Sequence, residues 1–231
     1  MEILKVEHVT KIYGSGENAV RALQDVSFTV PRGEFTAIVG ESGSGKSTLL
    51  NCIGGLDDPT DGKVYINGTD LFAMTEKKRT IFRRRNIGFV FQSFQLIPEL
   101  NVEQNIIFPL LLDYQKPDPT AVEEVLKVLG LADRRRHLPG QLSRGQQQRV
   151  ALGRAVITKT LLILADEPTG NLDSKSSQDV MELLTAASRK YRQTILMITH
   201  NMNLTASVDR VLHVSDGILT DLGGKRNEKL S

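Results

Sequence analysis

The sequence predicts an α/β fold in which a helical block interrupts a core of parallel strands. An apolar run at 35–39 leads into a glycine-rich loop and an apolar-patterned segment, which indicates strand, loop and helix. Residues 161–165, 180–187 and 194–199 indicate buried strand, amphipathic helix and buried strand, an order that implies parallel strands. A helical pattern fills about 93–157 between these two parts. The sequence therefore predicts one core with an inserted helical subdomain.

The first third of the chain predicts antiparallel strands beside this core. Residues 3–9 and 25–30 alternate apolar and polar side chains, as half-buried strands do. Residues 63–66 form a further strand pattern, and the Asn67-Gly68 pair that follows is a hairpin turn signal. We therefore expect an antiparallel β subdomain ahead of the helical block.

Local signals predict the next elements. Residues 75–87 are polar and basic, which predicts a helix with a solvated face; a docking surface is the less common meaning of such a run. A strand pattern at 87–91 then ends at Gln92. Asp118 and Pro119 supply a cap and a first-position proline for a helix. Apolar residues continue that helix at the expected spacing: Val122, Val125, Leu126 and Leu129, with Gly130 to end it.

The end of the chain carries one turn signal and little apolar patterning. Asp216-Gly217 predicts a second hairpin turn. The last residues are polar. We therefore expect residues 1–223 to form a single domain and residues 224–231 to form a polar tail.

Composition excludes several classes of function. Charged residues make up 24% of the 231-residue chain and the net charge is only +2, so no overall field favours nucleic acid. Cys52 is the only cysteine, which excludes an internal disulfide and fits a small buried residue better than a reactive thiol. The N-terminus alternates like a strand, unlike a signal peptide, and no apolar run approaches the roughly 18 residues that cross a bilayer. Work at a membrane would need another protein as anchor.

The glycine-rich loop carries the strongest chemical signal. The stretch from Gly40 to Thr48 has the spacing G-x-x-x-x-G-K-[ST], in which glycines let successive N–H groups face phosphate oxygens. The helix that follows adds its positive end, Lys46 supplies a charge for the β- and γ-phosphates, and Ser47 supplies a hydroxyl for Mg²⁺. A plain glycine-rich turn does not account for Lys46 and Ser47 in register. The predicted nucleotide-binding residues are Gly40, Glu41, Ser42, Gly43, Ser44, Gly45, Lys46, Ser47 and Thr48.

Two carboxylates follow the buried strand at 161–165. The carboxyl ends of such strands are where open α/β sheets bind their ligands. Asp166 is suited to hold Mg²⁺ through its water shell, and Glu167 could orient or deprotonate the attacking water. Because side chains alternate along a strand, we expect the two carboxylates on different sides. The alternative is that they only cap the next turn.

A second anion site is predicted at a helix start. Ser143 followed three residues later by Gln146 is a capping box. The first turn of that helix would offer a hydroxyl, free N–H groups and a positive dipole end. A chain with one phosphate loop has little need of a second anion site for the same nucleotide. Two copies arranged head to tail would use both sites.

The order of these motifs resembles the ATP-binding cassette of ABC transporters, over nearly the whole chain. The resemblance rests on residues 40–48, Gln92, 142–146, 161–167, 171–173 and His200. It implies a P-loop NTPase fold of ABC type: a RecA-like core, an antiparallel β subdomain and an inserted helical subdomain. It also implies ATP and Mg²⁺ as cofactors and ATP hydrolysis coupled to transport. An integral-membrane permease and a second copy of the chain are the implied partners, with no nucleic acid.

The resemblance implies roles for matching residues near the nucleotide. Tyr13 would stack on the adenine, and His200 would contact the γ-phosphate. Gln92 would contact Mg²⁺ and the attacking water, and would sense the permease. On this basis Glu167, His200 and Gln92 are the expected catalytic residues, and Ser47, Gln92 and Asp166 are the expected metal ligands.

Other matching residues would act across a dimer. Ser143, Gly145 and Gln146 would meet the γ-phosphate bound to the opposite subunit, and Asp173 would lie at the seam. The chain departs from the usual Leu-Ser-Gly-Gly-Gln by carrying Arg144 at the third position. A contact made through the N–H of residue 144 would survive this change, whereas a positive φ there or a tight approach to the partner would penalise a side chain.

Finer resemblance points to exporter-type cassettes of the lipoprotein-releasing, macrolide-efflux and antimicrobial-peptide-resistance group. The stretches 89–98 and 165–174 carry this likeness. It implies a chain that works at the cytoplasmic face of the cell membrane, held there by the permease.

Two other functions remain open. A soluble cassette acting in an assembly process would share the motifs but lack a membrane partner. A GTP-dependent switch would need a guanine-reading segment such as N-K-x-D, which the sequence lacks, and would leave 142–146 unexplained.

Overall fold

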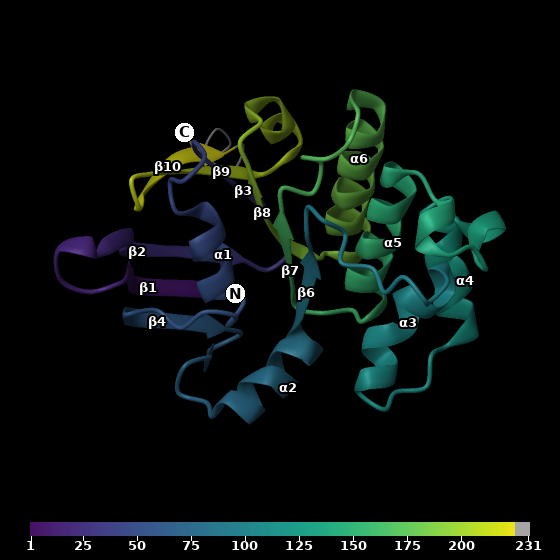
Figure 1. Ribbon diagram of the computed structural model, residues 1–231, viewed down its shortest axis with the longest axis horizontal. Coiled ribbons are helices and arrows are strands. Elements are labelled where there is room, and N and C mark those ends of the chain that lie inside the picture. Colours follow the sequence, from purple (N-terminus) through teal and green to yellow (C-terminus); the bar gives the residue numbers. More distant parts are fainter. Residues whose placement is uncertain (225–231) are drawn as a thin grey trace.

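The computed structural model describes residues 1–224, apart from the side chains of residues 190 and 191. Within these residues the larger sheet has the strand order β10-β9-β3-β8-β7-β6 (Figure 1). Its strands are β3 (Phe35–Val39), β6 (Ile87–Val90), β7 (Leu162–Asp166), β8 (Thr194–Thr199), β9 (Arg210–Ser215) and β10 (Ile218–Gly224). Neighbouring strands are parallel except β9 and β10. The predicted α/β class is confirmed, since β6 pairs with β7 across the whole helical block.

The second sheet is antiparallel, with the order β2-β1-β4-β5. Its strands are β1 (Glu2–Tyr13), β2 (Val20–Pro31), β4 (Asp61–Ile66) and β5 (Thr69–Asp70). β1 and β2 run further than predicted and are joined through the 3-10 turn η1 (Gly16–Asn18). Asn67 and Gly68 have φ of 49° and 78° and make the predicted hairpin turn between β4 and β5.

The helical block lies between β6 and β7 in sequence. It consists of α3 (Val102–Leu112), α4 (Pro119–Val128), α5 (Arg144–Ile157) and the short turns η2 (Ala132–Arg134) and η3 (Pro139–Gln141). Asp118 caps α4 as predicted, accepting from the N–H of Thr120 at 3.0 Å. Figure 1 shows α3 and α4 on the side of the molecule away from the antiparallel sheet. α5 contacts α3, α4 and also β6, so the block is joined to the larger sheet through this helix.

The remaining helices flank the sheets. α1 (Lys46–Ile53) follows β3, α2 (Glu76–Asn86) precedes β6, and α6 (Ser174–Tyr191) joins β7 to β8. The 3-10 segment η4 (Met202–Ser207) follows β8. β10 extends to Gly224, so the first residue of the predicted tail belongs to a strand; residues 225–231 lie outside the described part of the chain.

Two apolar cores lie on opposite faces of the parallel strands, because successive side chains of a strand alternate. On one face α1 lies between the two sheets, with Leu49 and Leu50 packed among strand residues such as Ile38 and Leu164. On the other face, side chains at the neighbouring strand positions pack with α3, α4, α5 and α6 in a second core. Members of that core include Ala37, Ile163, Met197, Ile106, Leu126, Val150 and Leu184. The parallel strands are therefore covered by apolar packing on both faces.

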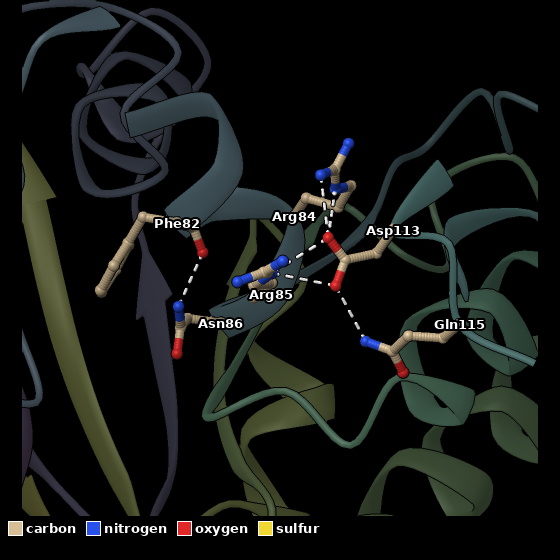
Figure 2. Close-up of polar contacts among 6 residues, drawn as sticks. All are labelled: Phe82, Arg84, Arg85, Asn86, Asp113 and Gln115. Atoms are coloured by element: carbon tan, nitrogen blue, oxygen red, sulfur yellow. Dashed lines mark hydrogen bonds and ion pairs between the residues drawn. The ribbon is translucent and has the colours of Figure 1, made fainter. Parts of the chain in front are cut away.

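α2 has no buried residue and exposes Glu76, Lys77 and Lys78, as the predicted solvated face requires, but its basic end also makes contacts that the sequence did not predict. The guanidinium of Arg83 donates to the carbonyl of Gly55 at 2.6 Å. Arg84 and Arg85 both donate to the carboxylate of Asp113, the residue that follows α3, at 2.8 to 3.1 Å (Figure 2). The side chain of Gln115 donates to the same carboxylate. This α2–Asp113 bridge ties the helical block to the segment before β6.

Candidate active site

A cavity of about 790 Å³ opens at the carboxyl ends of β3 and β7. Many of the predicted site residues line it, from four separate parts of the sequence. These predicted residues are Ser42, Gly43, Gly45, Lys46, Ser47, Thr48, Gln92, Asp166, Glu167 and His200. The structure therefore brings the phosphate-loop motif and the carboxylates together, as a ligand between them would require.

The loop conformation depends on glycine at two positions. Gly40 and Gly45 have φ of 154° and 107°, values that residues with a Cβ rarely adopt. A Cβ on Gly40 would collide with the carbonyl oxygen of Val214, and one on Gly45 with that of Ala22. The loop thus packs directly against the backbone of β9 and β2, which fixes its position relative to the sheet.

Backbone carbonyls of the phosphate loop hold the side chain of Lys46 in place. Its ammonium donates to the carbonyls of Gly40 at 2.9 Å and Glu41 at 2.5 Å, and approaches the Ser44 hydroxyl at 3.4 Å. Burial lowers the pKa of Lys46, and the nearby charges of Glu167 and Asp166 oppose that shift. The positive charge is therefore positioned and partly desolvated, a state that strengthens its attraction for phosphate.

Asp166 and Glu167 both line the cavity, so the expectation that they face different sides was wrong. β7 ends at Asp166, and Glu167 has φ of 44°, outside the strand conformation whose alternation we assumed. The N–H of Glu167 donates to the carbonyl of Ile198 at 3.0 Å, which holds this turn against β8. Burial, and then the neighbouring charge of Glu167, raise the pKa of Asp166.

Glu167 also contacts His200, a pairing that the sequence did not predict. Nδ1 of His200 lies 2.8 Å from Oε1 of Glu167. The Glu167 side chain is 14% exposed and that of His200 is 65% exposed, so the carboxylate is sheltered and the imidazole reaches solvent. An imidazole N–H donated to Glu167 would fix the orientation of that carboxylate in the cavity.

Gln92 reaches the cavity from the end of β6. Its backbone carbonyl accepts from the side-chain amide of Asn171 at 3.0 Å, and its own amide lies 3.4 Å from Oδ1 of Asn171. A Cβ on Gly170 would lie 2.7 Å from the Gln92 amide nitrogen, so a larger residue there would displace the end of the Gln92 side chain. The segment after β7 therefore supports Gln92.

The remaining predicted site residues do not line the cavity. Tyr13 ends β1, where its hydroxyl donates to Asp57 at 2.6 Å and Lys11 lies 4.8 Å from its ring centre. Asp173 caps α6, accepting from the N–H and hydroxyl of Ser176, which lower its pKa. Gly40, Glu41 and Ser44 belong to the loop but are also absent from the lining.

The predicted capping box is present at the start of α5. Ser143 accepts from the N–H of Gln146 at 3.3 Å, and the Gln146 side chain accepts from the N–H of Ser143 at 2.9 Å. Arg144 is the first residue of the helix and does not have positive φ, so its backbone conformation accommodates a side chain. A Cβ on Gly145 would press on Ser176. This helix start lies outside the cavity of its own chain.

Sequence reasoning missed one wall of the cavity. Val20, Arg21, Ala22, Gln24, Asp216 and Gly217 also line it. The N–H of Gly217 donates to the carbonyl of Ser44 at 3.0 Å, and the N–H of Gln24 donates to the carbonyl of Gly217 at 2.8 Å. Asp216 and Gly217 were predicted as a turn and they form one, with φ of 47° and 77°. Nothing in the local sequence signals that this turn packs against the phosphate loop.

The donors around the cavity suit a hard cation such as Mg²⁺. Ser47, Gln92 and Asp166 offer a hydroxyl, an amide oxygen and a carboxylate, the oxygen ligands that Mg²⁺ prefers. No group of three or more His, Cys, Asp or Glu side chains that could hold a metal occurs within residues 1–224. A cation here would therefore depend on phosphate oxygens and water for its other ligands.

The fold and the cavity define a nucleoside triphosphatase with a phosphate loop. Residues 23–170 match the family described as ABC transporter, and the chain belongs to this family of ATP-hydrolysing cassettes. It is 44% identical over 218 residues to the lipoprotein-releasing system ATP-binding protein LolD of Bordetella avium, covering 94% of this chain and 95% of that protein. It is 43% identical over 225 residues to the uncharacterized ABC transporter ATP-binding protein MJ1508 of Methanocaldococcus jannaschii, covering 96% and 100%.

Solved structures agree with this assignment. The ATP-binding cassette MJ0796, in a dimeric post-hydrolysis state bound to ADP and phosphate, matches with a TM-score of 0.85 and 40% identity, covering 96% of this chain and 99% of that one. CbiO1 from Clostridium perfringens, part of an ABC transporter complex, matches with a TM-score of 0.86 and 29% identity, covering 99% and 90%. ABC ATPases work with membrane permeases and dimerise. Within residues 1–224 no helix has the length and apolar character to span a bilayer.

Proposed function

We propose that this chain is the ATP-hydrolysing subunit that powers a separate membrane permease of the exporter type. The convergence of Lys46, Asp166 and Glu167 on one cavity carries the enzymatic part of this proposal. The exporter type is supported by the 44% identity to a lipoprotein-releasing ATP-binding protein over nearly the whole of both chains. The chain would then work at the cytoplasmic face of the cell membrane, held there by its permease.

Each cavity residue has a role that fits its chemistry. Lys46 and the loop amides would bind the β- and γ-phosphates, and Glu167, oriented by His200, would take the proton of the attacking water. Ser47, Asp166 and Gln92 would hold Mg²⁺, which when bound neutralises phosphate charge.

A second copy of the chain would complete the site. The start of α5 offers N–H groups, a hydroxyl and a positive helix end, yet it does not line its own chain's cavity. In a head-to-tail dimer Ser143, Gly145 and Gln146 would meet the γ-phosphate held by the other copy. Asp173 would lie at the seam, and Tyr13, 42% exposed, would stack on the adenine.

A groove between the helical block and β6 would receive the permease. It has a volume of about 290 Å³ and an apolar floor that includes the stacked rings of Phe89 and Phe91. Arg84 and Arg154 line it, and no acidic residue does. The groove adjoins the turn that carries Gln92, so a cytoplasmic helix of the permease seated here would lie next to the catalytic machinery.

ATP-dependent association tests this proposal. Glu167→Gln should retain ATP without hydrolysing it, so sedimentation with ATP and Mg²⁺ should show a dimer and sedimentation without nucleotide a monomer. Lys46→Ala, which loses the loop's only formal positive charge, should bind no ATP and stay monomeric. A Glu167→Gln protein that stays monomeric at high concentration with ATP would contradict the dimer.

Two further measurements distinguish the alternative functions. Failure of the chain to co-purify with any membrane subunit would favour the soluble assembly cassette. Faster turnover of GTP than of ATP would favour the GTP-dependent switch.

A further inference from the structure

The turn that carries Gln92 has an unusual backbone. The N–H of Phe94 donates to the carbonyl of Phe91 at 3.2 Å, and the N–H of Gln95 donates to that of Ser93 at 2.6 Å. Gln92 is therefore the second residue of a tight turn that starts at Phe91. Phe94 and Gln95 have φ of 62° and 50°, two consecutive left-handed residues that are not glycine. Such a backbone persists only when its surroundings hold it.

Arg154, in the last turn of α5, supplies that hold. One terminal nitrogen of its guanidinium donates to the carbonyl of Gln95 at 2.6 Å, and the other to the carbonyl of Phe94 at 2.9 Å. No carboxylate of residues 1–224 forms an ion pair with Arg154, and burial lowers its pKa. The two strained carbonyls are thus the acceptors that satisfy a partly buried cation.

We infer that Arg154 is a positioning residue that holds Gln92 at the cavity by clamping the carbonyls of Phe94 and Gln95. This inference rests on the proposed function, in which Gln92 contacts the metal and the attacking water. α5 carries both Ser143 at its first end and Arg154 near its last, so one rigid helix spans from the proposed trans site to the turn of Gln92. Arg154 and Gln95 also line the groove proposed for the permease.

The geometry requires arginine, not merely a positive charge. A guanidinium presents two parallel donors in a fixed fork, whereas a lysine ammonium is a point donor on a flexible stem. Arg154→Lys should therefore only partly replace the clamp, and Arg154→Met should remove it while keeping an apolar stem. Arg149→Met is the matched control: Arg149 also lies on α5, but it pairs with Asp179 at 2.6 Å and does not touch the turn.

Hydrogen exchange in the full chain measures the clamp directly. In Arg154→Met the amides of Phe94 and Gln95 should exchange roughly tenfold faster or more, since hydrogen bonds to a charged donor are among the stronger ones. Arg154→Lys should fall between this variant and the unchanged protein. Arg149→Met should leave exchange in the turn unchanged even if it lowers the melting temperature. Unchanged exchange at residues 93–97 in Arg154→Met would overturn the clamp.

A double-mutant cycle on ATP turnover then tests whether the clamp acts through Gln92. Arg154→Met should lower kcat with little change in KM for ATP, and should have no further effect on kcat when Gln92→Ala is present. Additive losses would show that Arg154 acts by another route and would overturn the positioning role. If Gln92→Ala alone keeps full turnover, the proposed role of Gln92 fails, and hydrogen exchange still decides the clamp.

Discussion

At the scale of single residues, two neighbouring carboxylates have different surroundings within one cavity. Asp166 ends β7 and has a raised pKa, caused first by burial and then by the charge of Glu167. Glu167 sits in a left-handed turn and contacts the exposed ring of His200. Asp166 thus carries an electrostatic cost that a cation would relieve, whereas Glu167 is oriented as a proton acceptor needs to be. Their roles should separate on mutation.

Glu167→Gln should reduce single-turnover hydrolysis by about 10²–10⁴-fold, the contribution of a positioned base, and leave ATP affinity nearly unchanged. Asp166→Asn should lower hydrolysis and Mg²⁺-dependent ATP binding together.

The stability of the fold should also depend on the protonation of Asp166, because its folded-state pKa is raised. The contribution of this group to folding stability is complete at pH values below the usual carboxyl range near 4, and it is lost as the pH rises through the raised value. Asp166→Asn should therefore raise the melting temperature at pH 7, and more than at pH 4. Normal hydrolysis by the Glu167→Gln protein would show that another residue is the general base.

At the scale of elements, the helical block is attached to the core at several separate places. α5 packs on β6, Arg154 clamps the turn after β6, and the α2–Asp113 bridge joins the block to the end of α2 (Figure 2). Asp113 accepts from both Arg84 and Arg85 and its side chain is only 6% exposed. Asp113 has a lowered pKa, with hydrogen bonds from Gln115, Arg85 and Arg84 as the causes. The bridge therefore fixes one side of the proposed permease groove.

Asp113→Asn should weaken this bridge and lower the melting temperature, because two guanidinium groups lose their shared anion. The effect should shrink at high salt, since ions screen the interaction in the unchanged protein. In a double-mutant cycle Arg84→Gln and Asp113→Asn should couple. Glu7→Gln, which removes the ion pair of Glu7 with the exposed Lys5, is the control and should leave the melting temperature unchanged. Additivity between Arg84→Gln and Asp113→Asn would show that the bridge contributes nothing.

At the scale of the whole molecule, the cavity, the start of α5 and the groove are separate surfaces. The proposed function assigns them to the nucleotide, a second copy and the permease respectively. Their relative positions can be probed with single engineered cysteines, because the native Cys52 is fully buried and burial raises the pKa of its thiol to about 12. A thiol with so high a pKa is hardly ionised at pH 8 and reacts slowly.

Cysteines at Ser93 and at Glu99 should each crosslink to a cytoplasmic helix of the permease in assembled complexes. Both positions are exposed and lie in the segment between β6 and α3, which also supplies Gln95 to the groove. A cysteine at Ser215, at the opposite edge near the β9–β10 turn, is the control and should give no such crosslink. Crosslinks obtained only from Ser215 would reverse the proposed orientation.

The sequence alone determined the features that depend on local chemistry. Strand, loop and helix at 35–53, the capping box at Ser143 and the turn at Asp216-Gly217 were all predicted, because capping, turn formation and periodicity involve residues within a few positions of one another. The motif order was enough to identify the family, and with it the ATPase activity.

The way distant segments meet became known from the three-dimensional structure. It placed the Asp216-Gly217 turn and β2 beside the phosphate loop, joined Glu167 to His200, and put both Asp166 and Glu167 in one cavity. It also joined the basic end of α2 to Asp113 and placed Arg154 against the carbonyls of Phe94 and Gln95. These contacts join residues far apart in the chain, and their geometry follows from sheet order and core packing. Sheet order and core packing leave no signal in any short stretch of sequence.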